Sequence, residues 1–161
     1  MPNFASKDLL TQAYASSKYA CPGALGQEFY FEGGVFMWVK ARATLAAGDL
    51  CAWKIGVNPN LFEVDDQTSA AAELNRPAGF ACSAAVTGDW LCIQMGGQNT
   101  SLALGLLTDG GVAAGELCVP DGTDKQLDSA VIGTDGDQAI VMALADDVST
   151  ALSQYRIVRL R

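Results

Sequence analysis

Residues 35–57, with the sequence VFMWVKARATLAAGDLCAWKIGV, decide the fold because they hold two apolar runs divided by one tight turn. The runs 35–45 and 49–57 contain the β-branched and aromatic residues that strands favour, and Ala47-Gly48-Asp49 between them is typical of a turn. Similar runs and turns follow at intervals of about ten residues, which is the pattern of a β-sandwich or β-barrel. We therefore predict an all-β fold: a compact barrel or sandwich of short antiparallel strands with at most one or two short helices.

The turns divide the chain into nine expected strands: 35–45, 49–57, 61–64, 79–86, 89–95, 101–107, 115–119, 138–145 and 153–160. Within this part of the chain only residues 67–75 (QTSAAAELN) have helical character, and Pro77 closes that segment.

The first 27 residues differ from the rest because they are polar and show no clear periodicity. They end in Cys21-Pro22-Gly23, a sequence suited to a hinge. We predict an extended N-terminal arm over residues 1–27, with one short helix near 6–16, followed by a single β-rich body over residues 28–161.

One short sequence returns within the body. Residues 46–51 (AAGDLC) are matched 67 residues later by residues 113–118 (AAGELC), and a second apolar pair follows each copy. Chance produces such similarity in chains rich in Ala and Gly. If the repeat is real, the body consists of two related β-units, about 35–107 and 108–161, packed on one core.

The composition is short of charge, and the charge is one-sided. Of the 161 residues, 50% are hydrophobic and 17% are charged, with a net charge of −8. This combination argues against disorder, which needs low hydrophobicity, and against nucleic-acid binding, which needs a basic face. It also predicts that a partner covers some apolar surface. No secretory signal and no membrane span is visible in the sequence.

The charge is distributed unevenly. Residues 77–155 contain ten acids and one base, whereas the last six residues contain three arginines: Arg156, Arg159 and Arg161. An acidic body with a basic C-terminal strand suits head-to-tail or ring-like self-association, with these arginines as electrostatic contacts between subunits. The alternative is that the acids form a solvated face.

The sequence offers no convincing catalytic constellation. It has no His, which excludes His-based triads and imidazole metal sites, and it has no phosphate-binding glycine loop. The acid pairs, including Asp65-Asp66 and Asp146-Asp147, stand beside turn residues, so we interpret them as turn formers. The loops 121–124 and 135–137 could bind calcium but do not match an EF-hand. We expect no enzyme, no cofactor and no metal.

The cysteines and tryptophans have a structural and a functional interpretation. Four cysteines (Cys51, Cys82, Cys92 and Cys118) lie in apolar runs, which favours reduced core residues. Each of the three tryptophans (Trp38, Trp53 and Trp90) also lies in an apolar run, which favours the core over a sugar-binding platform.

Three stretches of the second half resemble the lambda-type head decoration proteins of tailed phages. They are the loop 121–124 (DGTD), the apolar run 138–150 (QAIVMALADDVST) and the terminal strand 155–158 (YRIV). That family carries an Asp-Gly-Thr loop, an apolar strand ending in Ala-x-Asp plus Ser or Thr, and a final strand with an aromatic residue. Residues 46–51, together with AGFA at 78–81, also resemble the small phage capsid cement proteins.

The resemblance implies a β-tulip-like virion protein, made in the host cytoplasm, that binds the outside of a phage capsid. It would assemble as a homotrimer and stabilise the shell by clamping neighbouring major capsid protein subunits, without nucleic acid or membrane. An arm that orders on the shell would use Phe4, Tyr14 and Tyr19 as apolar capsid contacts. The alternative function is a carbohydrate-binding β module on a virion surface, and a hydrolase with two carboxylates is a third hypothesis.

Overall fold

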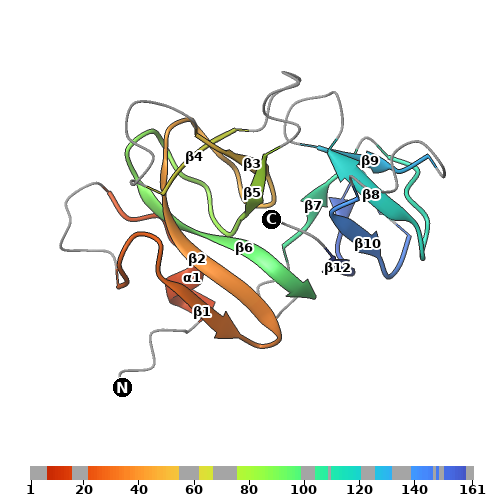
Figure 1. Ribbon diagram of the computed structural model, residues 1–161, viewed down its shortest axis with the longest axis horizontal. Coiled ribbons are helices and arrows are strands. Elements are labelled where there is room, and N and C mark those ends of the chain that lie inside the picture. The colour runs from red at the N-terminus through yellow and green to blue at the C-terminus, as the bar shows by residue number, and fades with distance from the viewer. Residues whose placement is uncertain are drawn as a thin grey trace.

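The computed structural model describes residues 7–15, 22–54, 62–66, 76–98, 104–108, 110–120, 126–131, 139–146, 148 and 151–158. Figure 1 shows one short helix and a set of short strands. The elements are α1 (Lys7–Leu10), β1 (Glu28–Phe31), β2 (Gly34–Ala41), β3 (Leu50–Trp53), β4 (Glu63–Asp66), β5 (Pro77–Ala81), β6 (Trp90–Gln98), β7 (Leu106–Leu107), β8 (Leu117–Pro120), β9 (Leu127–Ser129), β10 (Val141–Ala143), β11 (Ala151–Leu152) and β12 (Tyr155–Ile157).

Five strands close into a barrel. They follow the order β2-β4-β3-β5-β6, and the barrel closes because β6 also pairs with β2 from Gly34↔Gly97 to Lys40↔Trp90. The interior is filled by one cluster of buried side chains: Met37, Val39, Ala41, Leu45, Cys51, Val64, Ala78, Ala81, Ala85, Leu91 and Ile93. The prediction of an all-β barrel is confirmed.

Strand β1 pairs antiparallel with β2. Beyond the barrel the hydrogen-bonded sheet continues through four more strands, and we call this part the second sheet. At its C-terminal end β6 pairs with β12, and the order then runs β12-β10-β8-β9, while β7 and β11 pair separately. In Figure 1 these strands lie to the right of the barrel. A second apolar cluster joins residues on the outside of the barrel, such as Phe36 and Phe80, to residues of the second sheet, such as Val141 and Tyr155.

The unbroken apolar run of β2 follows from this arrangement. Met37 and Val39 belong to the interior cluster, whereas Phe36 and Trp38 belong to the cluster outside the barrel. A strand that is covered on both faces needs apolar residues at consecutive positions, and an alternating pattern is lost.

Most of the observed strands are shorter than expected, although β6 is longer, and three strands fall outside the predicted ranges. These three are β1, β9 and β11. The strands are antiparallel with one exception, because β2 and β4 are parallel through Lys40↔Glu63 and Ala41↔Val64. Helix appears in the described residues only at Lys7–Leu10, and the helical segment expected at 67–75 lies outside them.

One turn recurs four times, at residues 24–27, 46–49, 86–89 and 113–116. In each, the third residue is Gly with a positive φ, and the fourth N–H donates to the first carbonyl oxygen at 3.0–3.3 Å. The side-chain oxygen of the fourth residue accepts the N–H of the first at 2.8–3.1 Å. The fourth position must therefore carry an acceptor, which is Gln27, Asp49, Asp89 or Glu116.

Each turn also forms two backbone hydrogen bonds with one residue of a neighbouring strand, which in three of the four turns is the last residue of that strand. The Gly N–H donates to a carbonyl oxygen at 2.8–2.9 Å, and the N–H of that same strand residue donates back to the fourth residue at 2.8–3.2 Å. The strand residues that form these two hydrogen bonds are, in the order of the turns, Trp38, Ala81, Ala41 and Ala143. The two copies of the short sequence, 46–51 and 113–118, thus form the same local structure. The division into two related units and the boundary at residue 27 stay predictions.

Two copies of this turn differ in the space around their glycine, which is Gly48 in one and Gly115 in the other. Gly48 and Gly115 have φ values of 90° and 88°, so alanine is strained to a similar degree at both. A Cβ at Gly48 would collide with the Gly105 carbonyl oxygen, whereas a Cβ at Gly115 would meet no atom of the described residues within 4 Å. We expect Gly48→Ala to lower the free energy of unfolding by about 1–3 kcal/mol more than Gly115→Ala, measured by urea denaturation. Equal losses would contradict the close approach of residues 104–108.

A buried hydrogen bond joins the barrel to the second sheet. The Tyr155 hydroxyl on β12 donates to Gln94 Oε1 on β6 at 2.7 Å, and both residues are fully buried. Gln94 Nε2 in turn donates to the backbone carbonyl oxygens of Gln98 at 2.9 Å and Gly96 at 3.3 Å. Burial, followed by the nearby Cys82 thiol, raises the pKa of Tyr155 above its ordinary value.

Tyr155→Phe leaves Gln94 Oε1 without its donor, so we expect a loss of about 1–3 kcal/mol at neutral pH. Because the pKa of Tyr155 is raised in the folded state, its contribution to stability is complete below pH ~10 and declines as the pH rises further. The difference between wild type and variant should therefore shrink in alkaline solution. Urea unfolding across pH 7–11 measures both effects, and Tyr30→Phe is the control because Tyr30 is 80% exposed. A difference that stays constant up to pH 11 would contradict the linkage.

Candidate functional site

The described part of the N-terminal segment packs against the barrel. Leu10 is fully buried in the cluster outside the barrel. Tyr14 exchanges two backbone hydrogen bonds with Trp90, at 2.7 and 2.8 Å, and its ring meets Trp38 edge-on with centroids 5.8 Å apart. The Tyr14 hydroxyl donates to the Leu9 carbonyl oxygen at 3.1 Å. These residues complete the core of their own chain.

This placement bears on the three residues predicted to touch a capsid. Tyr14 is half-buried on its own barrel, so only part of its side chain is available to another molecule. Phe4 and Tyr19 lie outside the described residues. Capsid contact by these three aromatic residues stays a prediction.

The aromatic residues beside Tyr14 form one packed group. The Phe29 ring stacks near both Phe36 and Trp38, with centroids 5.8 and 6.0 Å apart. Trp38 is buried, and Trp53 and Trp90 are half-buried. A sugar platform needs exposed rings, so this arrangement does not favour the carbohydrate-binding alternative.

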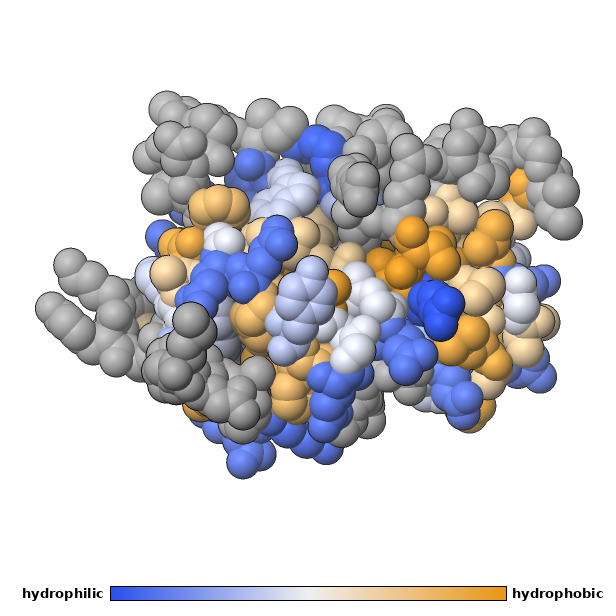
Figure 2. Space-filling model, turned by 60° about the horizontal axis from the view of Figure 1, so that its bottom comes forward, coloured by the Kyte–Doolittle hydropathy of each residue, from blue (hydrophilic) through white to orange (hydrophobic). Residues whose placement is uncertain are grey.

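The second sheet presents an outer apolar face, which we define by Leu117, Met142, Leu144, Val158 and Arg156. The register places Arg156, Met142 and Leu117 in one row across β12, β10 and β8. Burial alternates along these strands, so their neighbours Cys118, Val141 and Tyr155 point into the core. In Figure 2 hydrophobic surface gathers over this half of the molecule, on the right of the view.

Arg156 is the charged member of this face. It is exposed, and it is one of the three arginines predicted to make contacts between subunits. Arg159 and Arg161 lie outside the described residues. Arg156 is thus at the surface, where a contact between subunits requires it to be. Such contacts stay a prediction for all three arginines.

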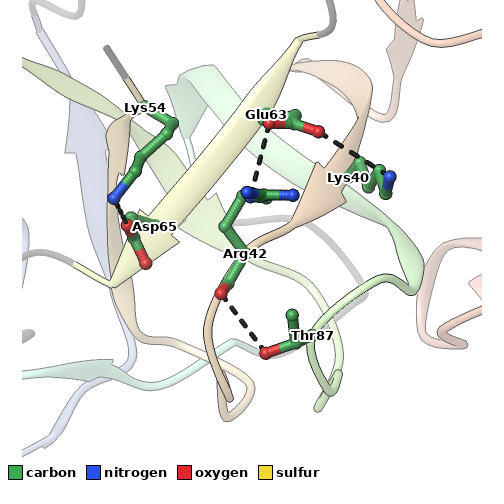
Figure 3. A network of polar contacts seen from close by, with 6 residues as sticks. All are labelled: Lys40, Arg42, Lys54, Glu63, Asp65 and Thr87. Atoms are coloured by element: carbon green, nitrogen blue, oxygen red, sulfur yellow. Dashed lines mark hydrogen bonds and ion pairs between the residues drawn. The ribbon is translucent and has the colours of Figure 1, made fainter. Parts of the chain in front are cut away.

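A polar network holds β4 between its neighbours on the barrel surface (Figure 3). Glu63 forms ion pairs with Lys40 at 3.7 Å and Arg42 at 3.4 Å, both at the end of β2. On the other side of β4, Lys54 pairs with Asp65. The network places basic side chains on both sides of an acidic strand, and so it favours this position for β4.

The acidic residues take positions that the sequence predicted only in part. Asp49, Asp89 and Glu116 are turn acceptors, and Asp146 Oδ1 accepts the Ala114 N–H at 2.8 Å. The interpretation of Asp65-Asp66 as turn formers is wrong, because both lie on β4 and Asp65 is paired with Lys54. The pairing with basic neighbours explains why acids are stable on that strand.

The described residues contain no group of three or more His, Cys, Asp or Glu side chains placed to hold a metal ion. The acidic loops 121–124 and 135–137 lie outside them. No helix among the described elements has the length and apolar character needed to cross a membrane. Cys51, Cys82, Cys92 and Cys118 are buried and reduced, as their apolar runs predicted.

The sequence matches no known family and no curated protein. Among solved structures, the chain is similar to the N base of head fiber gp8.5 of bacteriophage phi29, with a TM-score of 0.53 and 19% identity. The match covers 80% of this chain and 97% of the fiber base. The chain has the fold of that base. Since the coverage of the fiber base is nearly complete, the likeness extends beyond a single small barrel.

The ion pairs around β4 give a prediction that depends on salt. Glu63→Gln keeps the shape of the side chain and removes its charge, so we expect a loss of about 0.5–1 kcal/mol at low ionic strength. The loss should shrink in ~1 M NaCl, where the screening length falls to about 3 Å. Glu28→Gln is the control, because Glu28 is exposed and makes no ion pair among the described residues. Urea denaturation at both salt concentrations measures the effect, and a loss independent of salt would contradict the ion-pair role.

Proposed function

We propose that this chain is a structural virion protein that binds the outside of a phage capsid. The observation that carries the proposal is its likeness to the N base of a phage head fiber over nearly the whole of that base. Fold alone does not fix function, so the surface must supply independent support. That support is the exposed apolar face of the second sheet, because an exposed apolar patch is typical of a surface that binds another protein.

The finer parts of the proposal concern how the protein acts on the shell. It stabilises the capsid as a decoration or cement protein by clamping neighbouring major capsid protein subunits, and it assembles there as a homotrimer. Its role is not enzymatic and needs no cofactor. The resemblance of the loop 121–124 and the run 138–150 to head decoration proteins supports this form of binding.

A variant that tests the arm must keep the contacts of Leu10 and Tyr14 with the barrel. A deletion of residues 1–20 would remove Leu10 and Tyr14, which pack against the barrel, and so would disturb the fold as well as any capsid contact. Substitution of Phe4 and Tyr19 to alanine leaves both of those contacts in place. Tyr30→Ala is the matched control, since Tyr30 is an exposed aromatic residue with no predicted capsid role.

The test is sedimentation of the full chain with empty shells assembled from the major capsid protein encoded in the same genome. We expect the wild type and Tyr30→Ala to sediment with the shells. The double variant Phe4→Ala, Tyr19→Ala should bind at least about tenfold more weakly, as loss of an apolar interface anchor requires. A wild-type protein that stays in the supernatant would overturn the proposed function. Unchanged binding of the double variant would overturn only the role of the arm.

A further inference from the structure

Two places in the chain share one local structure and differ in what covers them. At the first, Gly48 donates to Ala81 at 2.8 Å, and Ala81 donates to Asp49 at 3.0 Å. At the second, Gly115 donates to Ala143 at 2.9 Å, and Ala143 donates to Glu116 at 2.8 Å. The strands that follow pair in the same register, with Leu50↔Phe80 and Cys51↔Gly79 at the first place and Leu117↔Met142 and Cys118↔Val141 at the second. Leu117 and Met142 are therefore the positional equivalents of Leu50 and Phe80.

At the first place, another part of the chain covers these positions. Residues 104–108 lie directly over the turn, close enough that the Gly105 carbonyl oxygen leaves no room for a Cβ at Gly48. Leu50 and Phe80 are fully buried and share one cluster with Leu104 and Leu106. An apolar pair on the outside of a sheet is thus covered by an apolar segment.

At the second place, no described residue supplies the equivalent cover. A Cβ at Gly115 would meet no atom of the described residues within 4 Å. Leu117 is 39% exposed, and its neighbours on the outer apolar face, Leu144 and Val158, are 41% and 46% exposed. The face keeps the apolar character of its covered counterpart, and hydrophobic surface gathers over this half of the molecule in Figure 2.

We propose that the outer apolar face binds the surface of a second copy of this chain. The internal counterpart supports this partner, because the chain already covers an equivalent apolar pair with its own residues. Charge is compatible with this partner, because Arg156 stands in the middle row of the face and a second copy carries 18 acids against 10 bases. This inference rests on the proposed function in one respect, since it names the surface through which the proposed trimer would form.

The test is the mass of the full chain in solution, measured by light scattering from micromolar to submillimolar concentration. We expect the wild type to associate. Leu144→Glu and Arg156→Glu should each raise the dissociation constant by at least about tenfold. Leu144→Glu would bury an unpaired acid in the interface, and Arg156→Glu would reverse the charge of the face. Val86→Glu is the matched control, since Val86 is 58% exposed but lies on a loop at the barrel. Circular dichroism and urea unfolding establish that each variant folds. If Leu144→Glu does not fold, Arg156→Glu alone tests the interface.

Two outcomes would overturn the inference: a wild type that is a single copy over the whole concentration range, or face variants that associate as the wild type does. Binding of shells by a wild type that never self-associates would assign the face to the capsid protein instead, while the proposed function would stand. Self-association without shell binding would support the face and overturn the proposed function. Shell binding therefore tests the proposed function, and self-association tests the role of the face, each without the other.

Discussion

Strand β6 is the constraint on which the rest of the structure depends, because it belongs to two sheets. From Trp90 to Gly97 it pairs with β2, and at Ile93 and Gln94 it also pairs with β5, which closes the barrel. At Gly97 and Gln98 it pairs with β12. Its side chains alternate between the barrel interior, filled by Leu91 and Ile93, and the cluster outside, which contains Cys92. A polar side chain on such a strand must find its partners within the protein.

Gln94 meets this requirement and also joins the two sheets. Its amide donates to backbone carbonyl oxygens near the end of its own strand, while its oxygen accepts the hydroxyl of Tyr155 from β12. Gly97, with a φ of 83°, lies so close to the backbone of Gly33 and Gly34 that a side chain would not fit. The transfer from barrel to second sheet therefore depends on one buried amide and one glycine.

The sequence was sufficient for the class of fold and for the central strands, since their apolar runs are bounded by turns with Gly and Asp. It was insufficient for strands that owe their existence to a partner. Residues 127–129 (LDS) have little strand character and become β9 by pairing with β8. Strand β1 did carry a signal that was missed: Phe29 and Phe31 alternate with Glu28 and Tyr30, and Glu32-Gly33 forms the turn with two positive φ values.

The candidate site was predictable to a smaller extent. The aromatic character of the N-terminal segment is visible in the sequence, but an aromatic residue that docks on its own barrel looks the same as one that docks on a partner. Tyr14 is an example, since its backbone bonds to Trp90 could not be inferred from spacing. The outer apolar face was anticipated only as a surplus of apolar residues, because its members come from three strands that the register of the sheet brings together.

The acidic excess of the chain follows in part from its recurring turn. The fourth position of that turn needs an acceptor for a backbone N–H, which Asp and Glu provide and Lys and Arg cannot. Three of its four copies use an acid, at positions 49, 89 and 116, and Asp146 accepts a further backbone N–H. Asp49 is almost fully buried, so it contributes little to a solvated coat. Glu116, by contrast, accepts its backbone N–H and stays exposed. The turn therefore requires an acceptor at its fourth position whether that position is buried or at the surface.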